Sequence, residues 1–206
     1  MSTEAYIHHA EGTAAGGTLA FGFHGTGGDE TQTVGLLRDL LPGAAIVAPR
    51  GDVSEHGAAR FFRRRAEGLY DMEDLARATE KLAGFVAAHV AAAKPSRVVG
   101  LGYSNGANIL ASVIFARPDL FDDAVLMHPL VPWTPAPSPV RARVLITAGE
   151  RDPICPPART RALEDWLRAQ GTDVTTHWQP GGHEIDRSEL IAAARFLGAV
   201  APAGSA

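Results

Sequence analysis

The chain has 206 residues, enough for a hydrophobic core of its own, and we expect one domain covering residues 1–206. Hydrophobic residues make up 46% of the chain and charged residues 20%, a balance that excludes an intrinsically disordered protein. The net charge of −4 speaks against a nucleic-acid-binding domain, which is usually basic, and the single cysteine, Cys155, excludes an internal disulfide and a Cys-x-x-Cys metal site.

Strand-like and helix-like segments alternate along the chain. Short apolar runs predict strands at Thr18–His24, Ala45–Ala48, Arg97–Tyr103, Asp123–Met127, Arg143–Ala148 and Val174–Trp178. Apolar residues at helical spacing predict helices at Thr33–Leu41, Met72–Ala93, Asn105–Ala116, Pro157–Ala169 and Ser188–Val200. This alternation predicts an α/β fold, with a mostly parallel central sheet flanked by helices on both faces. We expect the core to cover about residues 18–200 and the tail at 201–206 to be flexible.

One motif carries chemistry. Residues 102–106 read GYSNG, a G-x-S-x-G sequence placed between a predicted strand and a predicted helix. In that setting the chain turns so tightly that the residues two before and two after the serine must be small. The turn lifts the Ser104 hydroxyl above the sheet and places it at a helix N-terminus, where negative charge is favoured. The motif therefore predicts that Ser104 is a nucleophile.

A serine nucleophile needs a base, and the base needs an orienting acid. In this kind of fold the chain order is serine, then Asp or Glu, then histidine. Asp152 in GERDPI and His183 in PGGHEI follow that order, and each lies just past a predicted strand. Taken singly, Asp152 is an ordinary turn residue and His183 an ordinary loop histidine. Their joint placement at strand ends favours a triad of Ser104, Asp152 and His183.

An oxyanion-binding pair is predicted from the same geometry. One donor is the main-chain N–H of Asn105, the residue after the nucleophile. The second is expected from the loop after an early strand, and HGTGG at residues 24–28 fits, with the N–H of Thr26 as the donor.

Other chemistries fit less well. The glycines at 100, 102 and 106 approach a dinucleotide fingerprint, but the acid expected about 20 residues later at a strand end is missing. GTGG lacks the G-K-[ST] of a phosphate loop, and His183-Glu184 lacks the second histidine of H-E-x-x-H. We therefore expect no cofactor and no metal, and we interpret Cys155 as a small packing residue.

Arginine occupies four of the positions 60–65, and two phenylalanines occupy the others. We expect this stretch to be an irregular connection that follows the strand at Ala45–Ala48. It should therefore begin at the same edge of the sheet as Ser104. We expect Phe61 or Phe62 to form a wall of the substrate pocket. We also expect Arg64 at the pocket, where it fixes the loop by pairing with Glu67, Asp71 or a neighbour. In the alternative, both phenylalanines belong to the core and the arginines are solvated. A third interpretation has one arginine bind a substrate carboxylate.

The segment between the strand ending near Met127 and the next strand is only HPLVPWTPAPSPVRA, a proline-rich loop. Many enzymes of this fold insert a cap domain at that point, so we expect no cap and an open site. Leu130 and Trp133 from this loop are then further candidates for the pocket wall.

HGTGGDE, GYSNGAN, GERDPI and GGHEI together resemble the small carboxylesterases of the α/β-hydrolase superfamily, in the phospholipase/carboxylesterase group that also contains acyl-protein thioesterases. PRG…RFFRR…EGLYD and HPLVP resemble its bacterial members linked to resistance to hydroquinones. The resemblance implies a cofactor-free serine esterase, with the triad and the oxyanion loop on the residues named above. Thioesterases of the eukaryotic type usually carry Gln where this chain has Asn105, which disfavours protein depalmitoylation.

We accordingly expect a carboxylesterase that hydrolyses short-chain or aromatic carboxylic esters through an acyl-serine intermediate. The alternatives are a thioesterase, a lysophospholipase or a dienelactone-type hydrolase with the same triad, or a non-catalytic binding protein on the hydrolase fold. The expected partner is a small-molecule ester rather than a nucleic acid, and a homodimer is left open. An apolar run of about 18 residues and the features of a signal peptide are both missing from the sequence, so we expect a cytoplasmic protein without a membrane span.

Overall fold

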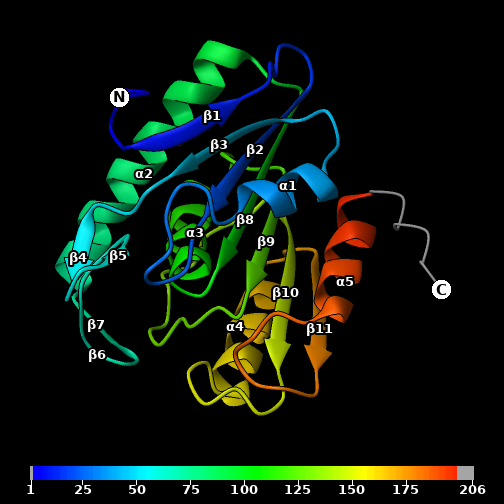
Figure 1. The fold of residues 1–206 in the computed structure, drawn as a ribbon. Helices are drawn as coiled ribbons and strands as arrows, with labels where there is room; N and C mark the ends of the chain where they lie inside the picture. Colours follow the sequence, from blue (N-terminus) through cyan, green and yellow to red (C-terminus); the bar gives the residue numbers. More distant parts are fainter. Residues whose placement is uncertain (1, 199–206) are drawn as a thin grey trace.

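The structure is a computed structural model and describes residues 2–198; the predicted tail at 201–206 and the end of the last predicted helix lie outside the described residues. A seven-stranded sheet forms its centre, in the order β1-β3-β2-β8-β9-β10-β11 (Figure 1). The strands are β1 (His8–Glu11), β2 (Thr18–Phe23), β3 (Ala45–Pro49), β8 (Arg97–Tyr103), β9 (Asp123–Met127), β10 (Arg143–Gly149) and β11 (Val174–Gln179). Only β1 runs antiparallel to its neighbour.

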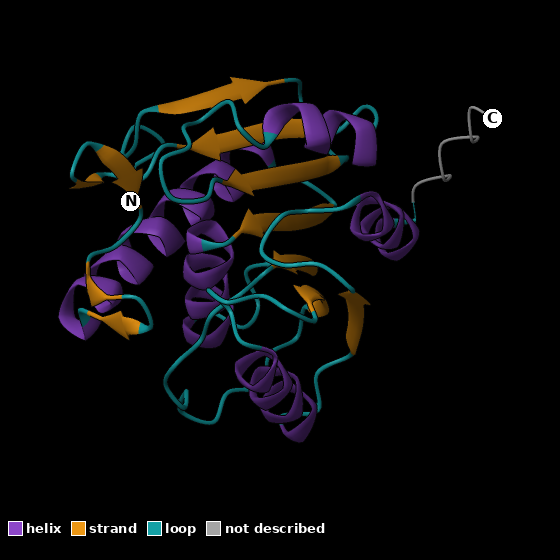
Figure 2. Ribbon diagram, turned by 60° about the horizontal axis from the view of Figure 1, so that its bottom comes forward, coloured by secondary structure: helices purple, strands orange, loops and turns teal. Residues whose placement is uncertain are grey.

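Helices cover both faces of this sheet, as Figure 2 shows. Side chains of α2 (Met72–Ala93), α3 (Asn105–Ala116) and α4 (Pro157–Ala169) pack in the core on one face. Side chains of α1 (Val34–Leu40) and α5 (Arg187–Leu197) pack on the other. The central strands β8 and β9 are almost wholly buried because both of their faces are covered, which is why they read as continuous apolar runs. The expected α/β-hydrolase architecture is confirmed.

Two features differ from the sequence-based expectation. Strand β1 was not predicted, because HHAE has no apolar pattern; it is an edge strand whose side chains are mostly half-exposed. The stretch expected to be irregular forms two small hairpins instead, β4 (Val53–Glu55) with β5 (Ala58–Arg60), and β6 (Arg64–Ala66) with β7 (Leu69–Tyr70).

The segment between β9 and β10 is where a cap domain would be inserted. The described chain has no helix or strand between β9 and β10, so the expected absence of a cap domain agrees with the order of elements. No helix among residues 2–198 has the length and apolar character needed to cross a membrane.

Candidate active site

The turn at Ser104 joins β8 to α3. Ser104 has φ 52° and ψ −114°, a positive φ that a non-glycine residue adopts only where its surroundings enforce it. A Cβ on Gly106 would lie 2.0 Å from the main-chain oxygen of Phe23, and a Cβ on Gly102 would lie 2.4 Å from that of Gly106. Both positions therefore require glycine, and the tight turn presents the serine at the amino end of α3.

Ser104, His183 and Asp152 form one chain of hydrogen bonds. His183 Nε2 lies 2.9 Å from Ser104 Oγ, and His183 Nδ1 lies 2.8 Å from Asp152 Oδ2. The three residues come from three loops, after β8, β10 and β11, and all of these loops lie at the carboxyl ends of parallel strands. A carboxylate accepts from Nδ1–H, which leaves Nε2 of a neutral imidazole free to accept a proton from the serine. The arrangement therefore suits proton removal from Ser104.

Asp152 is held in place from both sides. Its Oδ1 accepts the main-chain N–H groups of Ile154 and Cys155, each at 2.8 Å. Burial opposes the charged form of this carboxyl, but the Cys155 N–H and hydrogen bonds from His183 and His128 outweigh it, and the pKa of Asp152 is lower than usual. The carboxylate therefore stays ionised and fixed in orientation at neutral pH.

Tyr103 contacts the base through the main chain of His183. Its hydroxyl donates to the main-chain oxygen of His183 at 2.9 Å, and the two rings lie 5.5 Å apart. Burial raises the pKa of this phenol, so it remains a donor across the neutral range. The loop that carries His183 is thus tied to the strand that carries the serine.

The structure brings in a residue that sequence reasoning did not single out. His128 follows β9, is fully buried, and places its Nδ1 2.9 Å from the same Asp152 Oδ2 that faces His183. Its Nε2 contacts Glu189, a buried residue of α5, at 3.2 Å. The only sequence signal was a histidine directly after a strand, which many loops carry without function.

Thr26 and Asn105, the two predicted oxyanion donors, line the same cavity as Ser104. Among the described residues, neither of their main-chain N–H groups has a hydrogen-bond partner. The Asn105 side chain accepts the Phe61 N–H at 2.8 Å, and the Thr26 hydroxyl accepts from Arg60 Nη1 at 2.6 Å. These contacts tie the loop of Thr26 and the turn at Asn105 to the same segment, Arg60 and Phe61, and leave both main-chain N–H groups free.

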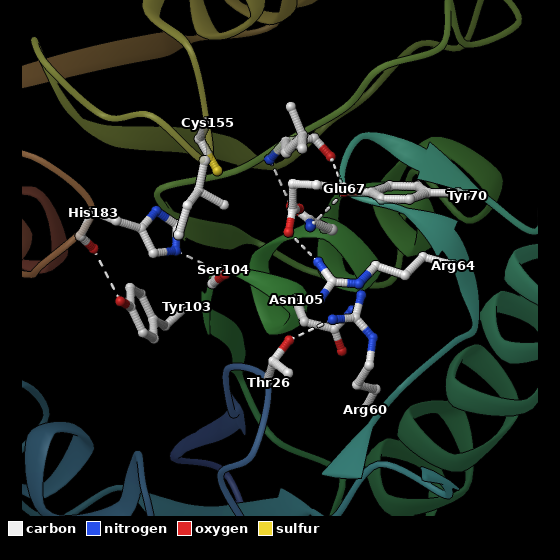
Figure 3. Close-up of a pocket in the computed structure, with 13 residues that line it drawn as sticks. Thr26, Arg60, Arg64, Glu67, Tyr70, Tyr103, Ser104, Asn105, Cys155 and His183 are labelled. Atoms are coloured by element: carbon white, nitrogen blue, oxygen red, sulfur yellow. Dashed lines mark hydrogen bonds and ion pairs between the residues drawn. The ribbon is translucent and has the colours of Figure 1, made fainter. Parts of the chain in front are cut away.

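A cavity of about 240 Å³ opens beside Ser104 (Figure 3). Polar and apolar residues share its wall, which includes Arg60, Arg64, Glu67, Tyr70, Leu130 and Ile154. Leu130 and Arg64 thus line it, as expected. Arg64 contacts Glu67 and donates from Nε to Glu55 at 2.9 Å, which ties the two hairpins together.

The prediction was wrong for the other three pocket residues, which do not line the cavity. The side chains of Phe61 and Phe62 are fully buried and do not line the cavity. Phe61 packs on the ring of His24 at 4.8 Å, and Phe62 packs edge-on against Tyr70 at the same distance. They belong to the core because their rings pack against other buried aromatic side chains, in the segment that connects β5 to β6. Trp133 also lies outside the lining, behind the Tyr70 ring at 5.9 Å.

Arg60 lines the cavity, but the sequence pattern did not distinguish it from the other three arginines at positions 60–65. Its side chain is only 3% exposed, and the Glu55 carboxylate approaches Nη1 no closer than 3.4 Å. Nε donates to the Phe62 main-chain oxygen at 3.3 Å, whereas Nη2 has no hydrogen-bond partner among the described residues. The buried guanidinium of Arg60 is therefore part of the cavity wall, and its Nη2 is unpaired among the described residues (Figure 3).

His128, Asp152 and His183 also offer three potential metal-ligand atoms within 4.8 Å of one another. Both Nδ1 atoms, however, already point at one carboxylate oxygen at hydrogen-bonding distance, and His183 Nε2 points at Ser104. The donor set therefore suits proton transfer better than metal binding.

Burial raises the pKa of the nearby Cys155 thiol far above its usual range, so this cysteine stays protonated.

Comparison with known proteins gives consistent matches. The model of the family described as the dienelactone hydrolase family matches residues 55–185. The chain is 40% identical over 170 residues to the putative hydrolase MhqD of Bacillus subtilis (strain 168), covering 81% of this chain and 85% of that one. Among solved structures, Atu2452 of Agrobacterium tumefaciens, of unknown function, is 55% identical with a TM-score of 0.91, covering 96% of this chain and 98% of that one. The Bacillus cereus carboxylesterase is 35% identical with a TM-score of 0.89, covering 94% and 93%.

Proposed function

The chain belongs to the dienelactone hydrolase family, a family of hydrolases that share its α/β-hydrolase fold, and on that premise we propose that it is a serine carboxylesterase acting through an acyl-serine intermediate. The observation that carries the proposal is the hydrogen-bonded chain from Ser104 Oγ through His183 to Asp152. The proposed substrates are short-chain or aromatic carboxylic esters.

In the first half-reaction, Ser104 Oγ attacks the ester carbonyl carbon while His183 Nε2 takes the hydroxyl proton. The carbonyl oxygen becomes an oxyanion, held by the N–H groups of Asn105 and Thr26. When the tetrahedral intermediate collapses, the bond to the alcohol oxygen breaks, and His183 returns the proton to that oxygen. The alcohol leaves, and the acyl group stays on the serine.

In the second half-reaction, a water molecule takes the place of the alcohol. His183 removes one of its protons as the water oxygen attacks the acyl carbon, and the same N–H groups hold the new oxyanion. Collapse expels Ser104, which regains its proton from His183, and the carboxylic acid is released. Each oxyanion donor of this kind contributes about 3 kcal/mol to transition-state stabilisation.

The size of the cavity supports small substrates. Its volume of about 240 Å³ lies below the roughly 300–1,000 Å³ typical of pockets for drug-sized ligands. Without a cap, the parts of a longer substrate that do not fit the cavity would extend into solvent. Tyr70 and Leu130 supply apolar surface beside the acyl group, and Tyr70 is fixed because its hydroxyl donates to the Leu130 main-chain oxygen at 2.9 Å.

A second candidate is a dienelactone-type or other ester substrate that carries a carboxylate. The unused Nη2 edge of Arg60 favours it, because a buried guanidinium is a strong partner for a carboxylate. Arg64 adds a second positive charge to the same wall, although Glu67 and Glu55 already engage it. The same triad would hydrolyse either kind of substrate.

The proposal is tested by replacing the nucleophile. Ser104→Ala should abolish hydrolysis of p-nitrophenyl acetate and p-nitrophenyl butyrate, while its thermal unfolding stays close to that of the wild type. A panel of thioesters and lactones, assayed on the wild type, then separates esterase from thioesterase or lactonase. Undiminished ester hydrolysis by folded Ser104→Ala would overturn the proposal.

A further inference from the structure

His128 lies between two buried carboxylates. Its Nδ1 faces Asp152 Oδ2 at 2.9 Å, and its Nε2 lies 3.2 and 3.1 Å from the two oxygens of Glu189. All three residues are at most 3% exposed. The catalytic steps described above make no use of His128 or Glu189, so this cluster needs an explanation of its own.

Glu189 accepts a hydrogen bond on each of its two side-chain oxygens. Its Oε1 accepts the Asp186 N–H at 3.0 Å, in the capping box that begins α5, and its Oε2 accepts the Thr147 hydroxyl. With both oxygens already accepting, the contact with His128 Nε2 is a donation from the histidine. Asp152 accepts on the other side of the ring, so the arrangement of acceptors suits a His128 with a proton on each ring nitrogen, an imidazolium.

We propose that His128, held as a cation by Glu189, is a positioning residue that shares Asp152 with His183 and sets the pH at which His183 becomes able to accept the Ser104 proton. The inference rests on the proposed function, since it concerns the same triad. It assigns a role to a histidine that touches neither the substrate nor the serine.

The physical reason is the charge balance at Asp152. A lone carboxylate beside His183 favours the protonated imidazole, which cannot act as a base. The imidazolium of His128, which contacts the same Asp152 oxygen, partly neutralises that carboxylate. It also repels a proton on His183, whose ring centre lies 5.2 Å from that of His128. Protonation of His183 thereby becomes less favourable, so the base is available at lower pH.

The groups that face His128 are consistent with a fixed cation. Burial opposes the charge, but the hydrogen bonds and charges of Glu189 and Asp152 outweigh it and raise the pKa of His128 above its usual value. The polar and titratable groups packed around the ring or acting on it come from β8, β10, the loops after β10 and β11, and α5: Tyr103, Thr147, Asp152, Cys155, His183, Glu184 and Glu189. Apart from the catalytic base His183, none of them can carry a positive charge.

Two variants remove the charge by different routes. His128 has φ 52°, and asparagine is among the residues that tolerate a positive φ, so His128→Asn keeps the main chain and can still donate one N–H to Asp152. Glu189→Gln keeps the shape of the partner but removes the charge that holds the imidazolium. In each, the acid limb of kcat/KM against pH should move up by roughly one pH unit, and the double variant should show no more than the His128→Asn shift.

Glu184→Gln is the matched control, because Glu184 is an exposed acid directly after His183. It should leave the acid limb unmoved or move it slightly downward. A purely structural role for His128 predicts lower kcat/KM at every pH with an unchanged midpoint, and that result would overturn the inference. A downward shift in Glu189→Gln would overturn it as well.

A measurement on the wild type keeps the test independent of variant folding. In protein labelled with ¹⁵N-histidine, the His128 nitrogens should both show the shifts of protonated imidazolium from pH 6 to pH 8. A neutral His128 in that range would contradict the inference. Failure of the proposed function is distinguishable, because it would appear as activity that survives in Ser104→Ala, whatever the state of His128.

Discussion

Arg60→Gln should change which esters the enzyme prefers. The Arg60 side chain is 3% exposed and lines the cavity, and its Nη2 has no hydrogen-bond partner among the described residues. A substrate carboxylate placed there would accept charge-assisted hydrogen bonds, each worth about 1.5–3 kcal/mol in net terms. One such bond corresponds to roughly a 10- to 150-fold effect on kcat/KM for an acidic substrate.

The assay compares two esters of nearly equal size. Methyl butyrate ends in a methyl group where monomethyl succinate ends in a carboxylate, so the ratio of their kcat/KM values isolates recognition of the charge. Changes common to both esters cancel in that ratio, including any caused by losing the Arg60 bond to the Thr26 hydroxyl. Arg60→Gln should lower the ratio of succinate to butyrate by about 10- to 150-fold.

Arg65→Gln is the matched control, because Arg65 is an exposed arginine of the neighbouring hairpin and does not line the cavity. It removes the same formal charge but should change the ratio less than about twofold, the small effect expected of a distant, screened charge. An equal ratio in wild type and Arg60→Gln would refute the reasoning. An equal fall in both variants would refute it too, by showing a long-range field rather than a site.

Three further outcomes follow from the geometry. Asp152→Asn should lower kcat by about three to four orders of magnitude, because an amide can hold His183 in the wrong tautomer; a loss below tenfold would contradict the assigned role. Phe61→Ala should lower the free energy of unfolding by about 3–5 kcal/mol in urea titrations, without changing the ratio of kcat/KM for acetate and butyrate esters. Gly106→Ala should give little folded protein, since its Cβ would lie 2.0 Å from a main-chain oxygen, and a folded, active variant would contradict this.

The fold and the triad were predictable because their signals are local and mutually consistent. Apolar runs marked the central strands, and the spacing of Gly102 and Gly106 around Ser104 reflects a turn that admits no Cβ at either glycine. Asp152 and His183 could be assigned because parallel strands bring their carboxyl ends to one edge. The assignment of one domain and of a cytoplasmic location stays a prediction.

The pocket wall was predictable only in part, because it depends on which way side chains point within the hairpins. Arg60 and Phe61 are adjacent in sequence, yet Arg60 lines the cavity while Phe61 points into the core, where its N–H is held by Asn105. The role of His128 could not be inferred either. Its two partners lie 24 and 61 residues further along the chain, and only the folded sheet brings them together.

The central claim is that Ser104 becomes covalently acylated during the reaction, and active-site labelling followed by intact-protein mass spectrometry tests it most directly. Wild-type protein treated with a fluorophosphonate should gain the mass of one phosphonyl group, and peptide mapping should place that group on Ser104. Ser104→Ala should gain none. Wild-type protein that is folded but stays unlabelled, or a label that persists in Ser104→Ala, would contradict the account.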